Sequence, residues 1–186
     1  MPPPRMALAG DVLVGSCPPL VTPFIDGSVD LDTYASLVEF QIANGTHGIV
    51  VNGTTGEPST LSIDERNSLV RTAVGVARGR VPVIAATGAQ SHADTLALTE
   101  AATAAGADAL LIVTPYFVRP PQRGLIAYYT DLAARTSLPW MIYHIPGRAA
   151  VSVELSTLVA IADNAPNFVG IKHASPDFAL VSAMIE

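Results

Sequence analysis

Lys172 is the only lysine in this 186-residue sequence, and the other basic side chains are arginines. It lies near the end of the apolar run 168–173, which is typical of a strand in a buried sheet. Burial removes water from an ammonium group and favours the neutral amine, which can act as a nucleophile. A lysine at a strand end can also extend its ammonium group to solvent, so position alone leaves both interpretations open.

Polar groups follow other predicted strands as well. Gly53-Thr54-Thr55-Gly56 offers two hydroxyls and backbone N–H groups that can turn toward a carboxylate or phosphate, although such turns are common in loops. Tyr143 is either a packing residue or a proton donor, and a buried phenol needs a partner such as a threonine hydroxyl. Arg148 can pair with a substrate carboxylate or remain a surface arginine.

Six apolar runs predict the strands that would position these residues. The runs are continuous rather than alternating, which is typical of a parallel sheet covered by helices. A helical segment follows each run, and the unit recurs about every 30 residues, the size of a strand–helix–strand unit. The predicted strands are 12–21, 48–52, 81–86, 109–113, 140–145 and 168–173.

Capping side chains predict where the helices begin. Ser62 and Glu65 have the spacing of a capping box, in which each side chain bonds the other's backbone N–H. Residues 25–29 are predicted to form a loop before the first helix, and Asn44-Gly45 is predicted to end that helix. The other predicted helix starts are Asp30, Ser91, Ser152 and Ser175-Pro176.

Two α/β architectures fit six such units. One is an open doubly wound sheet, and the other is a (β/α)8 barrel, which takes about 250 residues when complete. No Gly-x-Gly-x-x-Gly follows the first predicted strand, which argues against a dinucleotide site. In both architectures ligands bind beyond the carboxyl ends of the strands, so the polar residues named above are expected at one mouth.

Composition excludes several classes of function. The formal charge of −6 and the absence of a basic run argue against nucleic-acid binding. The longest apolar stretches are too short to span a bilayer, so no membrane association is predicted. The four histidines, His47, His92, His144 and His173, have no metal-ligand spacing with acids or Cys17, so we interpret them as structural and predict no metal.

One domain is predicted. Residues 1–11, with three consecutive prolines, are expected to be a flexible lead-in, and 12–186 to be the barrel domain. Asp11 interrupts any apolar signal segment, and Cys17 has no intrachain partner, which together favour a cytoplasmic protein.

Four motifs, in their order and spacing, resemble the dihydrodipicolinate synthase/N-acetylneuraminate lyase family of class I aldolases. They are Gly53-Thr54-Thr55-Gly56-Glu57, Thr114-Pro115-Tyr116, Tyr143-x-Ile145-Pro146-Gly147-Arg148 and Gly170-Ile171-Lys172. The resemblance implies the (β/α)8 barrel, of which about six units are present. Because family members complete eight units, we expect this sequence to be truncated after strand six.

The resemblance also implies a role for each matching residue. Lys172 matches the lysine that forms a Schiff base with pyruvate or another 2-oxo acid, and Tyr143 matches the tyrosine that relays protons. Thr54 and Thr55, after Gly53, match the pair that holds the keto-acid carboxylate and extends the relay. We therefore expect Lys172, Tyr143 and Thr55 to be catalytic. Arg148 matches the synthase-branch arginine that binds the aldehyde's carboxylate.

Three residues depart from the family pattern. Phe117 replaces a second tyrosine, whose hydroxyl reaches the site of a neighbouring subunit in the synthases. His144 replaces a usual asparagine, and His173 replaces a usual glutamate or similar residue. Arg148 favours 4-hydroxy-tetrahydrodipicolinate synthase activity, whereas Phe117 favours a lyase, aldolase or dehydratase acting on 2-keto-3-deoxy sugar acids.

The resemblance implies a covalent imine on Lys172 and no cofactor. The expected partners are a small 2-oxo acid, an aldehyde and further copies of the chain in a tetramer or dimer. The alternative from another class is a truncated, non-catalytic remnant that binds a partner protein.

Overall fold

The computed structural model describes residues 13–185, and its centre is a sheet of five parallel strands. The strands lie in chain order, so each pairs with the next along the sequence. They are β3 (Ile49–Val51), β4 (Val83–Ala86), β5 (Ala109–Val113), β6 (Trp140–His144) and β7 (Phe168–His173). The predicted strands 109–113 and 168–173 are confirmed residue for residue, and the strands at 48–52, 81–86 and 140–145 within two residues.

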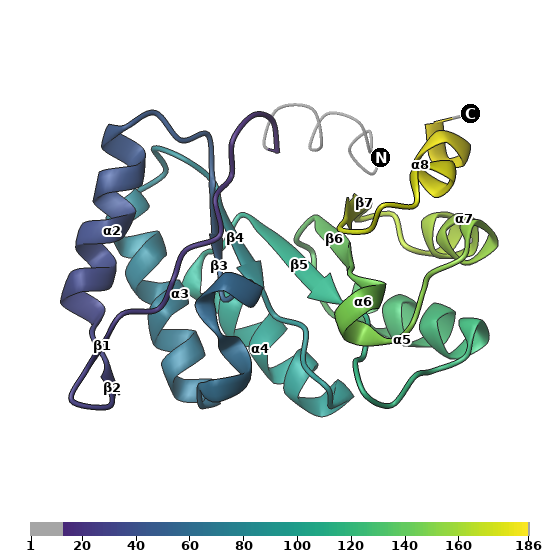
Figure 1. The fold of residues 1–186 in the computed structure, drawn as a ribbon, viewed down its shortest axis with the longest axis horizontal. Helices are drawn as coiled ribbons and strands as arrows, with labels where there is room; N and C mark the ends of the chain where they lie inside the picture. Colours follow the sequence, from purple (N-terminus) through teal and green to yellow (C-terminus); the bar gives the residue numbers. More distant parts are fainter. Residues whose placement is uncertain (1–12, 186) are drawn as a thin grey trace.

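Helices α2, α3, α4, α5 and α7 cover one side of the sheet in sequence order (Figure 1), and the single turn α6 lies at a cavity. Their bounds are α2 (Leu31–Ala43), α3 (Ile63–Ala77), α4 (His92–Ala105), α5 (Gln122–Ala134), α6 (Pro146–Ala149), α7 (Leu155–Asn164) and α8 (Phe178–Ile185). Among the described residues, no helix is both long enough and apolar enough to cross a membrane.

The predicted first strand, 12–21, is wrong over the described residues. This segment pairs with β3 through an isolated bridge between Pro19 and Val50, and the Leu20 and Val50 N–H groups donate to the Val50 and Pro18 carbonyls. A regular ladder does not form because Pro18 and Pro19 have no backbone N–H to donate. The predicted loop 25–29 instead contains a short antiparallel pair, β1 (Phe24–Ile25) and β2 (Ser28–Val29).

The predicted caps of the first helices are confirmed. Asp30 accepts backbone N–H bonds from Asp32 and Thr33, Ser62 and Glu65 form the capping box, and Ser91 caps α4. The caps predicted for the last two helices are wrong. Helix α7 begins after Glu154 rather than Ser152, because the Gln122 side chain accepts the Glu154 N–H and the Thr157 hydroxyl. Helix α8 begins at Phe178, after Asp177, whose carboxylate accepts the Leu180 N–H.

Both faces of the sheet are buried. The larger core lies between the sheet and the helices and contains Leu110, Ile112, Trp140 and Ile142. A smaller cluster on the opposite, concave face contains Val50, Ile84, Ala86, Ala109, Leu111 and Tyr143. Burial on both faces explains why these strands are continuous apolar runs. The predicted lead-in 1–11 lies outside the described residues.

Candidate active site

Tyr143 lies on β6 and points to the concave face, where only 7% of its surface is exposed. Its hydroxyl is 3.2 Å from the Thr54 hydroxyl, and either oxygen can be the donor. The sequence predicted a threonine partner for this phenol, and the structure places Thr54, not Thr55, at that position. A buried phenol with a hydroxyl partner can pass a proton in either direction.

Lys172 lies on β7 directly opposite Tyr143, and its Nζ is 4.1 Å from the centre of the Tyr143 ring. All six residues of β7 are half-buried, so the predicted buried strand is wrong for this element. The reason is that β7 pairs only with β6 in the described part of the chain. The ammonium group rests on the ring face, a favourable contact for a cation.

A bulge in β7 turns Lys172 toward the concave face. Trp140 pairs with Phe168, but Met141 pairs with Gly170, so Val169 is an extra residue in the ladder. Successive side chains on a strand alternate between faces, and one extra residue reverses every side chain after it. Without the bulge, Lys172 would share the helix-facing side with Phe168.

The Gly53–Gly56 turn is a short 3₁₀ helix, η1 (Thr54–Gly56), after β3. The Thr22 hydroxyl donates to the Gly56 carbonyl at 2.7 Å and anchors the turn. A Cβ at Gly56 would lie 3.0 Å from the Leu20 carbonyl oxygen, so a glycine allows this close approach. Both threonine side chains remain exposed beside the mouth of the sheet.

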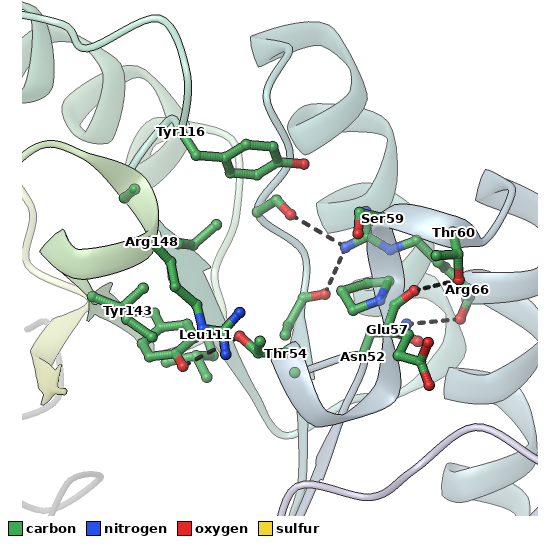
Figure 2. Close-up of a pocket in the computed structure, with 17 residues that line it drawn as sticks. Asn52, Thr54, Glu57, Ser59, Thr60, Arg66, Leu111, Tyr116, Tyr143 and Arg148 are labelled. Carbon is green, nitrogen blue, oxygen red and sulfur yellow. Dashed lines mark hydrogen bonds between the residues drawn. The ribbon is translucent and has the colours of Figure 1, made fainter.

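A cavity of about 360 Å³ opens at the carboxyl ends of the strands, a size suited to a small molecule. Figure 2 shows Tyr143 and Arg148 on one side of it, Arg66 and Asn52 on the other, and Thr54 between them. Gly53, Thr54, Tyr143 and Arg148 line it, whereas Lys172 and Thr55 do not. The complete lining is Asn52, Gly53, Thr54, Glu57, Pro58, Ser59, Thr60, Arg66, Ala86, Gly88, Leu111, Val113, Tyr116, Tyr143, Ile145, Arg148 and Ala149.

Arg148 reaches the cavity from α6, the single helical turn that follows β6. Pro146 begins this turn, where its missing N–H costs no helical hydrogen bond, and Ala150 ends it in the left-handed conformation. The neighbouring Ala149 is buried and fixes the turn against the protein, while Arg148 itself is exposed. The guanidinium can therefore meet a ligand at the mouth.

Arg66 is a cavity residue that the sequence did not predict. Its guanidinium donates to the carbonyls of Ala86 at 3.0 Å and Gly88 at 3.3 Å, and the Asn52 side chain donates to the Arg66 carbonyl. Burial lowers the pKa of Arg66. Its sequence setting, one residue after the capping box, is typical of a surface arginine, so no local signal marked it.

Residues 12–186 match the sequence profile of the Dihydrodipicolinate synthetase family. The chain belongs to this family. A 4-hydroxy-tetrahydrodipicolinate synthase from Rhodospirillum centenum is 47% identical over 163 residues, which are 88% of this chain and 56% of the relative. The predicted family resemblance is thereby confirmed.

Solved structures of family members match as well. The dihydrodipicolinate synthase from Aquifex aeolicus superposes with a TM-score of 0.90 at 38% identity, covering 92% of this chain and 58% of that chain. The chloride-inhibited enzyme from Acinetobacter baumannii, complexed with pyruvate, has a TM-score of 0.88 at 44% identity, covering 92% and 59%. The predicted barrel fold is confirmed, and the chain spans less than two thirds of each relative.

The three residues that depart from the family pattern lie in two settings. Phe117 is 82% exposed and has a φ of 72°, a left-handed conformation that is unusual for an aromatic residue. Its neighbour Tyr116 lines the cavity instead. His144 and His173 face each other on β6 and β7, with their Nδ1 atoms 2.9 Å apart. The parallel register of the two strands brings them together, a pairing that their separate motifs did not reveal.

Proposed function

We propose that this protein is a Schiff-base-forming class I aldolase or synthase that condenses pyruvate with an aldehyde, as a 4-hydroxy-tetrahydrodipicolinate synthase does. One observation carries the proposal: the amine of Lys172 lies over the ring of Tyr143, whose hydroxyl pairs with that of Thr54, and Tyr143 and Thr54 line the cavity. The names of the relatives, and the pyruvate complex among the solved structures, support this choice of reaction.

The first step joins Lys172 to the 2-oxo acid. The neutral amine adds to the C2 carbonyl, and the resulting carbinolamine loses its hydroxyl as water to leave an imine. The Lys172 amine lies over the Tyr143 ring, 4.1 Å from its centre, and the hydroxyl of this ring can donate the proton that the departing hydroxyl needs. Thr54 then returns a proton to Tyr143, so we assign the relay to Tyr143 and Thr54.

The second step forms the carbon–carbon bond. Loss of a proton from C3 of the imine gives an enamine, whose carbon attacks the aldehyde carbonyl, and the new alkoxide takes up a proton. The imine nitrogen accepts the electron pair, so the chemistry needs no resident cofactor. Hydrolysis of the product imine consumes one water and returns the Lys172 amine.

Two groups would hold the carboxylates. We assign the keto-acid carboxylate to Thr54 and Thr55, after Gly53, because their exposed hydroxyls can donate to it and because Gly53 and Thr54 line the cavity. Arg148 can bind a carboxylate on the aldehyde with two parallel hydrogen bonds. This second contact distinguishes an acidic aldehyde, such as aspartate semialdehyde, from a neutral one.

Phe117 supports a second candidate activity, a lyase, aldolase or dehydratase acting on 2-keto-3-deoxy sugar acids. Its exposed ring has no hydroxyl to donate, so a neighbouring copy would receive no proton from it. The same imine on Lys172 would serve this reaction. A homo-oligomer, with small-molecule substrates as the other partners, is part of the proposal for either activity.

Turnover tests the choice of substrate. The purified protein is expected to consume pyruvate with aspartate semialdehyde, and Lys172→Ala sets the background. Arg148→Leu should raise the KM for this aldehyde by about ten- to a hundredfold, because it removes a hydrogen bond to a charged group. The exposed Arg123→Leu serves as the matched control and should leave that KM unchanged. Turnover at the Lys172→Ala rate would exclude the synthase activity, and preference for sugar-acid substrates would support the second candidate.

A further inference from the structure

His144 and His173 form a hydrogen-bonded pair on the helix-facing side of the sheet. They are opposite each other in the register of β6 and β7, and their Nδ1 atoms are 2.9 Å apart. His144 is only 2% exposed. The pair therefore lies behind the wall that carries Tyr143 and Lys172, away from the cavity.

The neighbours of the pair fix its tautomers. The Val153 N–H donates to Nε2 of His144 at 3.2 Å, so this nitrogen must carry a lone pair. The proton of neutral His144 is therefore on Nδ1, which donates to Nδ1 of His173. His173 in turn carries its proton on Nε2, which is buried and has no partner among the described residues. One chain of donors thus runs from Val153 through His144 to His173.

The bond from Val153 to His144 closes a loop that contains Arg148. His144 is the last residue of β6, and Val153 follows it by nine residues, with the whole of α6 between them. Two other contacts hold the outer side of this loop: Arg119 donates to the Ala150 carbonyl at 3.0 Å, and Gln122 donates to the Ser152 carbonyl at 2.8 Å. Within the described chain, the His144 imidazole makes the side-chain hydrogen bond that joins this loop to the sheet, beside the buried side chains of Ala149 and Val153.

We propose that His144, with its tautomer fixed by His173, is a positioning residue that holds the Arg148 loop in place to bind the carboxylate of the aldehyde. The inference rests on the proposed function, since Arg148 is assigned that role there. It predicts that loss of the imidazole changes the KM for the aldehyde. The KM for the 2-oxo acid, which is assigned to Thr54 and Lys172, should not change.

Protonation would release the loop. An added proton on Nε2 of His144 removes the acceptor for Val153, and one on Nδ1 of His173 sets two N–H groups against each other. Burial, and then the charge of His173, lower the pKa of His144, whereas Asp177 before α8 raises it. On the α7 side, Glu154 is exposed, and on β7 Lys172 lies on the opposite face. Positioning should therefore weaken below pH 6.5.

Three variants test the inference by steady-state kinetics. His144→Gln keeps an acceptor oxygen near the Nε2 position but cannot titrate, and His144→Leu removes the acceptor at similar volume. His144→Leu should raise the KM for the aldehyde about two- to tenfold, with the KM for pyruvate unchanged. The wild-type aldehyde KM should rise below pH 6.5, and that of His144→Gln should not. The exposed His92→Gln is the control and should keep the wild-type profile.

Hydrogen exchange gives a readout that does not depend on activity. The Val153 amide should be protected at pH 7.5 in the wild type and in His144→Gln, and should lose protection in His144→Leu. In the wild type its protection factor should also fall as the pH drops below 6.5. The Ala174 amide is an internal control, because it donates to the backbone carbonyl of His144 at 2.8 Å and is independent of the imidazole.

The outcomes separate the two proposals. If borohydride traps no pyruvate on Lys172, the proposed function fails, and the Val153 exchange still reports whether the imidazole holds the loop. Equal pH dependence of the aldehyde KM in the wild type and His144→Gln would overturn the inference. So would a wild-type Val153 protection factor that stays constant as the pH is lowered from 7.5 until the protein begins to unfold, a comparison that needs no variant to fold.

Discussion

Tyr143 and Lys172 are opposite each other on neighbouring strands, but β6 and β7 support them differently. β6 has a paired strand on each side, and four of its five residues are buried, whereas β7 pairs with β6 alone and all six of its residues are half-buried. Tyr143, which lines the cavity and is the first member of the proposed proton relay, thus belongs to the well-packed part of the sheet. The amine depends on one strand pairing and one bulge, so changes in β7 should affect imine formation more than folding.

Insertion of one alanine between Gly170 and Ile171 should have the largest effect on this arrangement. Side chains alternate between the faces of a strand, so the added residue places Lys172 opposite His144, on the helix-facing side. The variant is expected to lose imine formation with pyruvate completely while keeping its helical circular dichroism. A folded insertion variant that still forms the imine at the wild-type rate would show that the register of β7 does not orient Lys172.

Tyr143→Phe tests the β6 side of the comparison. The substitution keeps the ring beneath Lys172 but removes the hydroxyl that is paired with Thr54. Loss of a positioned proton donor should slow imine formation about 10²- to 10⁴-fold, measured by stopped-flow absorbance or quenched trapping. Thr54→Val should slow it too, whereas Thr55→Val should act mainly through the KM for pyruvate. If Thr55→Val slows imine formation more than Thr54→Val does, Thr55 is the relay residue, as the sequence predicted.

Packing should differ between the same two strands. Ile142→Ala, on β6 and fully buried, should lower the free energy of unfolding by about 2–5 kcal/mol. Ile171→Ala, on β7 and half-buried, should cost less than about 2 kcal/mol, because part of its side chain already contacts water. Urea unfolding of both variants checks the difference. Equal costs would mean that β7 is as well packed as β6.

A change in pH should have the smallest effect, and this effect is on the free energy of unfolding. The pKa of His144 is lowered in the folded protein, chiefly by burial, so the unfolded chain binds a proton more readily. The free energy of unfolding should therefore be constant above about pH 7 and fall as the pH drops below 6.5. His144→Gln should lack this part of the decline in urea titrations. A wild-type stability that rises on acidification through this range would contradict the assigned tautomer.

Much of the fold could be predicted because local sequence and tertiary structure agree. The predictions that were confirmed depend on residues close together in the sequence. They are the apolar runs of β5 and β7 and the caps at Asp30, Ser62 and Ser91. The prediction of the first strand was wrong because its prolines have no backbone N–H groups to donate to a strand ladder. The Ser152 cap was wrong because Gln122, a residue distant in sequence, holds Glu154 and Thr157.

The sequence predicted which residues form most of the candidate site, but it did not predict how their side chains are placed. The motifs named Lys172, Tyr143 and Arg148, yet a period-two strand without a bulge would have placed Lys172 on the same face as Phe168. Arg66 was not predicted as a site residue, because nothing in the sequence of its helix indicates that it lines the cavity. The His144–His173 pair required the register between two strands, which neither strand specifies by itself.

The most direct test is reduction with borohydride in the presence of pyruvate, followed by peptide mass spectrometry. Because Lys172 is the only lysine in the sequence, the adduct has one lysine side chain on which to form. The account predicts a pyruvate-derived mass increase on the peptide that contains Lys172, and none in Lys172→Ala. A folded wild-type protein with no adduct would contradict the proposed chemistry and favour a non-catalytic, partner-binding role.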